Sequence, residues 1–227
     1  MSTYISHLQN YETELRDEFS SIIEKRTNPI IAIGGFSGTG KDTVALFIQD
    51  YFKNTHNLEL KIVGAGELVR KIANESGWKE QNLDEFMKHI QLTQNKEFAQ
   101  KVDIEIEKRA LKIALLEGGI LVGRMAPFVI GTNGLTIWLE VAAEVISTRI
   151  SQDSSRAEHG MDIKELIQRI KLRDSADRER LEEFYGISFQ DKKKFNFILR
   201  NEGYSIEKLE EIIKNILNEN FPPPEQN

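Results

Sequence analysis

The chain has 227 residues, 40% of them hydrophobic, and a formal charge of -6. This length is sufficient for one sizeable core, and the negative charge provides no general attraction to nucleic acid or anionic lipid, so neither partner is expected. The absence of cysteine excludes disulfides and thiolate metal ligands, and the four histidines lack ligand spacing.

The N-terminal region favours a cytoplasmic protein. Acidic residues occur early and there is no uninterrupted apolar segment, so neither a signal peptide nor a membrane span is expected. Instead, apolar residues at spacings of three and four predict an amphipathic helix: Leu8, Tyr11, Leu15, Phe19 and Ile22. We expect this segment, residues 1–28, to pack on the protein's own sheet; the alternative is that it docks a partner or a second copy of the chain.

The next segment joins a short apolar run to a glycine-rich turn and a lysine. Such a turn lets backbone N–H groups converge on phosphate oxygens, while the following helix offers its positive end and Lys41 reaches the β- and γ-phosphates. ATP with Mg²⁺ is therefore predicted to bind here. The residues predicted to hold it are Gly35, Ser37, Gly38, Thr39, Gly40, Lys41, Asp42 and Thr43. The usual pattern has Ser or Thr directly after the lysine, whereas here Asp42 precedes Thr43.

Farther along the chain, strand and helix patterns alternate. Besides the run that precedes the glycine turn, strands are predicted at 58–63, 120–122, 135–139 and 195–199. Helices are predicted directly after the glycine turn, over 67–116 with a turn near Gly77, around 145–150, and over 163–184 and 206–216. This alternation indicates a mainly parallel five-stranded α/β sheet with helices on both faces. We expect one domain over 29–220 and a loose tail over 221–227.

Six segments, in matching order, resemble nucleoside monophosphate kinases, and most closely the archaeal-type cytidylate kinases. They are Gly35–Thr43, Gly64–Arg70, Asp103–Glu107, Gly123–Arg124, Arg173–Arg180 and Phe184–Ile187. The resemblance covers roughly residues 30–217. It implies a P-loop kinase fold, a helical acceptor-binding insert over 66–116 and a short lid over 152–162 that closes over ATP.

The resemblance also implies roles for particular residues, because an arginine fork binds phosphate oxygens in pairs. The implied catalytic residues are Lys41, Arg124, Arg173 and Arg180. The implied acceptor-binding residues are Gly66, Arg70, Asp103 and Arg124, and the lid-side arginines implied to bind ATP are Arg149 and Arg156. Arg173 and Arg180 lie nearly two helical turns apart and so can share one face; a solvated charged face is the alternative. Arg70 also fits a solvent-facing helix position, and Asp103 with Glu107 fits either a surface pair or a contact to base or sugar.

Four positions depart from the family pattern: Asp42, Ala65, Val122 and Met125. Relatives often carry a carboxylate that organises Mg²⁺ where this chain has Val122. One hypothesis is that Asp42, with Thr43, supplies the metal site instead; the other is that its charge weakens ATP binding. Bacterial cytidylate kinases carry polar residues at Ala65 and Met125, so these positions do not specify cytosine.

The sequence therefore predicts ATP-dependent phosphoryl transfer to a nucleoside monophosphate, with CMP or dCMP as the best acceptor. No general base is expected, because the acceptor phosphate is already anionic. The alternatives are a small-metabolite kinase, such as one acting on dephospho-coenzyme A, and a catalytically weak nucleotide-binding regulatory protein.

Overall fold

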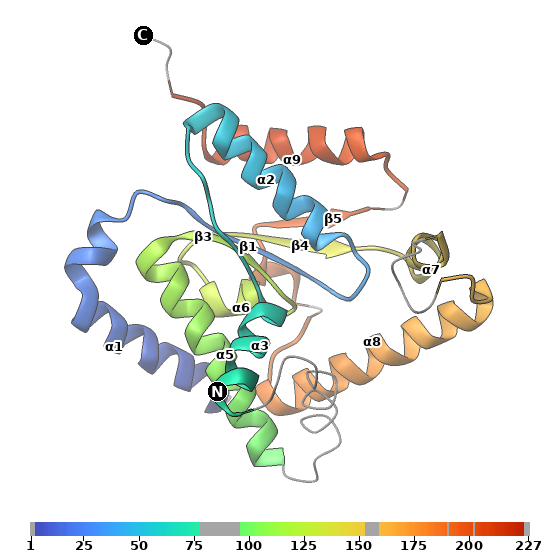
Figure 1. Cartoon of the computed structure of the whole chain (residues 1–227), viewed down its shortest axis with the longest axis horizontal. Coiled ribbons are helices and arrows are strands. Elements are labelled where there is room, and N and C mark those ends of the chain that lie inside the picture. Colours follow the sequence, from blue (N-terminus) through green and yellow to red (C-terminus); the bar gives the residue numbers. More distant parts are fainter. Residues whose placement is uncertain (1–2, 78–95, 153–158, 190, 202, 225–227) are drawn as a thin grey trace.

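The computed structural model describes residues 3–77, 96–152, 159–189, 191–201 and 203–224. Its centre is one sheet of five parallel strands in the order β2-β3-β1-β4-β5 (Figure 1). The strands are β1 (Ile30–Gly35), β2 (Ile62–Gly64), β3 (Gly119–Val122), β4 (Leu135–Glu140) and β5 (Phe197–Arg200). The predicted fold class is confirmed, and β1 lies in the middle of the sheet.

Helices cover both faces of the sheet, which explains why every residue of β1 is buried. On one face, α2 (Lys41–His56) and α9 (Ile206–Asn220) pack on each other and, in Figure 1, lie together above the strands. On the other face, the short helix α6 (Ala126–Ile130) packs on β1 and β4, and α5 (Lys96–Glu117) packs on β3 and α6.

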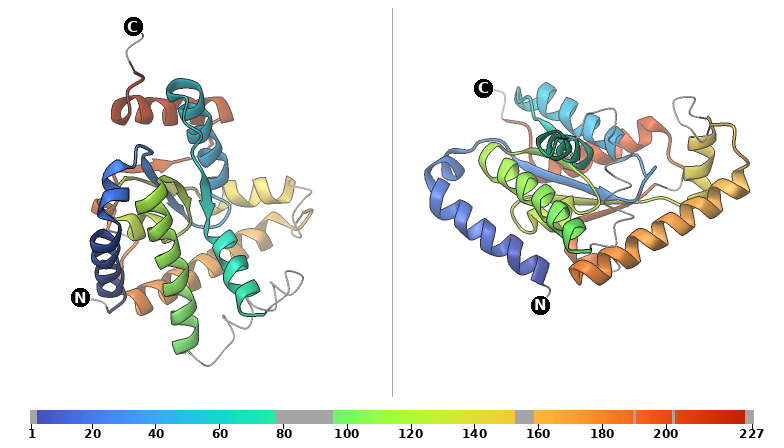
Figure 2. Two further views of the ribbon diagram at one scale, coloured as in Figure 1. Left: turned by 60° about the vertical axis from the view of Figure 1, so that its left-hand side comes forward. Right: turned by 60° about the horizontal axis from the view of Figure 1, so that its bottom comes forward.

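The N-terminal helix α1 (Thr3–Lys25) forms an outer layer on the α5 side, as both views in Figure 2 show. Its apolar stripe contacts mainly α5 and the end of α8. The prediction that α1 packs on the sheet is therefore wrong, because its partners are these two helices. Leu8 and Leu15 are buried, whereas Ile22 remains 49% exposed. The reason is that α5 and α6 already cover this face of the sheet. Among the described helices, none is both long and apolar enough to cross a bilayer.

The remaining helices border the carboxyl end of the sheet. Helix α3 (Ala65–Glu75) follows β2 without a loop and ends near Gly77, where a turn was predicted. Helices α7 (Ala143–Gln152) and α8 (Ile163–Tyr185) pack on each other through a small separate cluster of apolar residues. The Asp162 side chain caps α8 by accepting from two backbone N–H groups, and Gly186 ends it with a left-handed backbone.

Some predicted boundaries are corrected by the structure. Strand β2 begins at Ile62, not at residue 58, because the residues that pair with β3 are those from Ile62 to Gly64. Strand β5 begins at Phe197 rather than at 195, after the short 3-10 helix η2 (Lys192–Lys194). Helix α6 was not predicted. Most of the predicted lid (153–158) and the middle of the predicted insert (78–95) lie outside the described residues.

Candidate functional site

The glycine-rich turn follows β1 directly and leads into α2. Gly35, Gly38 and Gly40 all have positive φ, and a Cβ on Gly38 would lie only 2.5 Å from the Ile146 side chain. Glycine is required here because the turn is both left-handed and close to α7. Gly40 is the N-cap of α2 and has no side chain that could cap the first-turn N–H groups. These groups therefore form an anion-binding end of the kind that accepts phosphates.

The side chains of the turn fold back over it. The Thr39 hydroxyl donates to the Phe36 carbonyl at 2.9 Å, and the Lys41 Nζ donates to the same carbonyl at 2.7 Å. Lys41 also lines a cavity beside the turn. The predicted glycine-rich turn thus lies at the end of the central strand β1, with the Lys41 ammonium group held over it.

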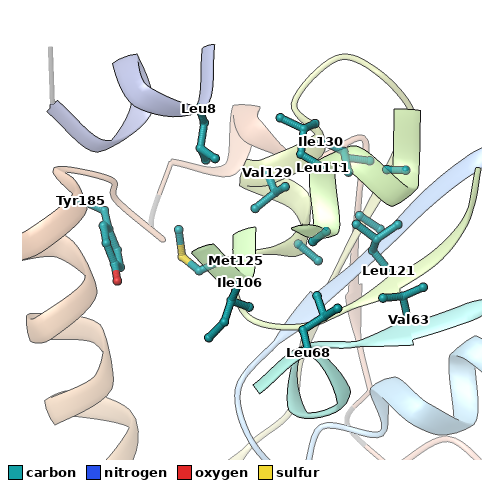
Figure 3. Packing of buried hydrophobic residues seen from close by; sticks show 14 of the residues in the cluster. Leu8, Val63, Leu68, Ile106, Leu111, Leu121, Met125, Val129, Ile130 and Tyr185 are labelled. Atoms are coloured by element: carbon teal, nitrogen blue, oxygen red, sulfur yellow. The ribbon is translucent and has the colours of Figure 1, made fainter. Parts of the chain in front are cut away.

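That cavity has a volume of about 390 Å³, within the range of small-ligand sites. Its walls come from the glycine-rich turn, the start of α3, the segment from β3 into α6, the middle of α5 and the end of α8. Figure 3 shows several of its lining side chains, with Tyr185 of α8 on one side and Val63 and Leu121 of the sheet on the other. The cavity joins the predicted phosphate loop to the predicted acceptor insert.

The predicted arginines occupy different places. Arg124 lines the cavity two residues after β3 ends. Arg70 on α3 is exposed, with its guanidinium near Gly66, which lines the cavity. Arg149 is half-buried on α7 and does not line this cavity. The side chains of Arg173 and Arg180 on α8, and all of Arg156, lie outside the described part of the chain.

Asp42 and Thr43 differ in their exposure to the cavity. Asp42 lines it beside Ser37 and Lys41, whereas Thr43 is exposed and absent from its wall. No group of three or more His, Asp or Glu side chains that suits a metal exists among the described residues. The donors present fit Mg²⁺ only as a partial site, in which a carboxylate would share the ion with phosphate oxygens and water.

Two acidic groups of α5 line the same cavity, one helical turn apart. Asp103 accepts a hydrogen bond from the Tyr185 hydroxyl, and Tyr185 packs against Tyr4 of α1 with ring centroids 4.0 Å apart. Burial, and then the charge of Asp103, raise the pKa of Glu107 to about 8. Glu107 therefore carries a proton at neutral pH. No pattern in the sequence predicted Tyr185 as a neighbour of Asp103.

Another cavity, of about 480 Å³, is lined by Phe36 and Thr39 of the glycine-rich turn. Arg178 of α8 lines it and stands 5.3 Å from the centre of the Phe36 ring. Arg178 lies within the Arg173–Arg180 segment, in which only Arg173 and Arg180 were given roles. The structure brings Arg178 to the glycine-rich turn, which it contacts by a cation–π interaction.

Comparison with known proteins agrees with this geometry. The model of the Cytidylate kinase-like family matches residues 30–203. The chain belongs to this family. A cytidylate kinase of Methanocaldococcus jannaschii is 30% identical over 192 residues, covering 83% of this chain and 97% of the relative. A cytidylate kinase of Methanococcus aeolicus is 28% identical over 188 residues, covering 81% and 94%.

Solved structures agree with the fold of this cytidylate kinase-like chain. An uncharacterised protein from Eubacterium ventriosum matches with a TM-score of 0.58 at 16% identity, covering 84% of this chain and 99% of its own. A shikimate kinase from Bacteroides thetaiotaomicron matches with a TM-score of 0.52 at 15% identity, covering 84% and 98%. By family and fold, the chain is a P-loop kinase of the nucleoside monophosphate type. Helix α1 lies before the residues that the family model matches.

Proposed function

We propose that this kinase transfers the γ-phosphoryl group of ATP to CMP or dCMP, giving ADP and the nucleoside diphosphate. The observation that carries the proposal is the single cavity that joins Lys41 and Arg124 to the acceptor-side walls of α3 and α5. The names of the archaeal relatives support the choice of acceptor. They do not favour a small-metabolite kinase.

In this proposal, the chain acts mainly by positioning and by charge. The open N–H groups at the start of α2 would bind the ATP phosphates, and Lys41 would move from the Phe36 carbonyl to a phosphate oxygen. Arg124 would hold the acceptor phosphate in line with the donor, because its guanidinium lines the shared cavity. Bound Mg²⁺ supplies charge neutralisation on the phosphates, and Asp42 would hold it directly or through water.

The remaining predicted residues complete the proposal. Arg70, Arg173 and Arg180 would add positive charge around the acceptor and the transferring group. Ser37, Thr43, Arg149 and Arg156 would bind ATP from the loop and the lid side, and Gly66 and Asp103 would contact the acceptor. Support for these roles comes from the family resemblance and, for Ser37, Gly66 and Asp103, from their place in the cavity wall.

The test is a coupled ADP-release assay with ATP and Mg²⁺ against CMP, dCMP, UMP, dUMP, AMP and GMP. We expect turnover confined to one or two acceptors, with the best kcat/KM for CMP or dCMP. Lys41→Ala is the contamination control and must lose the activity. ATP binding without turnover on any acceptor would overturn the proposal and favour a nucleotide-binding regulatory protein.

A further inference from the structure

The cavity has a polarity that matches the two ends of a nucleotide. Lys41 and Arg124 lie at the carboxyl end of β1 and β3. Asp103 on α5 accepts a hydrogen bond from Tyr185, which Figure 3 places across from Val63 and Leu121 of the sheet. If the cations take the phosphate, as the proposed function requires, the base faces the acidic pair on α5.

The two acidic groups differ in chemistry. The Tyr185 hydroxyl donates to Asp103, so the Asp103 carboxyl acts as a hydrogen-bond acceptor in this wall. Glu107 lies one turn farther along α5, among the apolar side chains of Ile106, Leu181 and Ala110 that line the same wall. Burial and the Asp103 charge both oppose ionisation of Glu107 and raise its pKa to about 8. The wall thus presents one hydrogen-bond donor beside one acceptor.

We propose that Glu107, in its protonated form, is a specificity-determining residue that donates to the ring nitrogen of cytosine, while Asp103 accepts from the exocyclic amine. On its Watson–Crick edge, cytosine carries an unprotonated ring nitrogen, which accepts, next to the exocyclic amine, which donates. Uracil presents an N–H where cytosine has the unprotonated ring nitrogen, so in the same pose its N–H would face the Glu107 proton. A site built in this way binds CMP and rejects UMP at neutral pH.

The other titratable and charged groups around Glu107 come from several elements. Tyr4 from α1 has its pKa raised by burial, then by the charge of Glu107. Asp103 from α5, Lys41 and Asp42 from the start of α2, and Arg124 from the segment after β3 line the same cavity. The acceptor phosphate loses its second proton near pH 6. Loss of the Glu107 proton is then the change that governs acceptor binding between about pH 7 and about pH 9.

The experiment measures KM for CMP and UMP across this pH range for the wild type, Glu107→Gln and Glu105→Gln. For the wild type, we expect KM for CMP to rise above pH 8, by at most about tenfold per pH unit. Glu107→Gln has no proton to lose, so its profile should be flat. Its amide can rotate to offer oxygen or nitrogen, so the preference for CMP over UMP should fall about tenfold. Glu105→Gln is the matched control, because Glu105 is on the same helix but bonds Arg109 and does not line the cavity.

Direct titration of CMP without ATP, near neutral pH and near pH 9, separates this inference from the proposed function. Weaker wild-type binding at the higher pH supports Glu107 even where turnover is absent. Equal binding at both pH values overturns the role of Glu107, whether or not the enzyme turns over CMP. The wild-type titration also decides the matter if the Glu107 variant fails to fold.

Discussion

Asp42 is the residue at which this chain departs most clearly from the usual phosphate-binding loop, and its carboxylate lines the acceptor cavity beside Lys41. We expect Asp42→Ser to lower Mg²⁺-dependent turnover by about 10–100-fold, as losses of metal-positioning groups do. The measurement is kcat at a series of Mg²⁺ concentrations. Thr43→Ser, which changes an exposed hydroxyl residue conservatively, is the comparison. A gain of activity in Asp42→Ser would mean that the native carboxylate weakens ATP binding.

Glu107 also makes stability depend on pH. Its pKa is raised from 4.5 to about 8, so the folded chain keeps a proton that the unfolded chain releases over this interval. The free energy of unfolding therefore falls as the pH rises from 4.5 to 8. Glu107→Gln should be more stable than the wild type at pH 8, and the gap should close toward pH 5. The slope of the difference is at most about 1.4 kcal/mol per pH unit. Urea unfolding at several pH values measures the free energy of unfolding of both proteins. A difference between them that does not change with pH would contradict the prediction.

Residues close in sequence were the predictable part of the site. Ser37, Lys41 and Asp42 belong to one turn, so their type and spacing alone place them at the phosphate loop. Tyr185 and Asp103 are 82 positions apart, and only the packing of α8 against α5 and α1 brings them together. No local pattern marks such a pair, which is why the acceptor wall was incompletely predicted.

At the level of elements, the strands were predictable because parallel strands buried on both faces read as continuous apolar runs. Helix α6 was missed because its five residues are too few to show a helical period, and they follow a strand with one short turn. The predicted end of β2 differs from the observed end by one residue, but its start was four residues too early, since Leu60 is fully buried without belonging to the strand. Burial alone does not distinguish a strand from the segment that leads into it.

Helix α1 supports the acceptor wall through Tyr4, which is 3% exposed and packs on Tyr185. We expect Tyr4→Ala to destabilise the protein by about 3 kcal/mol, the cost of removing a buried ring. It should also raise KM for the acceptor several-fold with little change in kcat, because Tyr185 and Asp103 lose their support. Tyr4→Phe, which keeps the ring, should restore KM.

The control on the same helix is Ile22→Ala, whose side chain is already 49% exposed. It should leave both the melting temperature and KM unchanged. If Tyr4→Ala lowers stability but leaves KM unchanged at a temperature where it is folded, α1 has no role in acceptor binding.

At the scale of the whole molecule, the apolar stripe of α1 is largely buried against α5 and α8 of the same chain. The exposed large apolar side chains of the described residues are spread over separate helices and the segments beside them, as with Leu46 on α2 and Leu172 on α8. We therefore expect a monomer at micromolar concentration, to be measured by light scattering after gel filtration. If the wild type is a dimer and Ile22→Asp is also a dimer, the interface is a surface other than α1. If Ile22→Asp is a monomer where the wild type is a dimer, self-association through α1 is supported.

Helix α1 lies outside the residues that the family model matches. In the proposed function, phosphoryl transfer depends on the loop after β1. Helix α1 instead packs through Tyr4 on Tyr185, whose hydroxyl donates to Asp103 in the cavity wall. We therefore expect substitutions in α1 to change acceptor selectivity while the phosphate-binding loop stays unchanged.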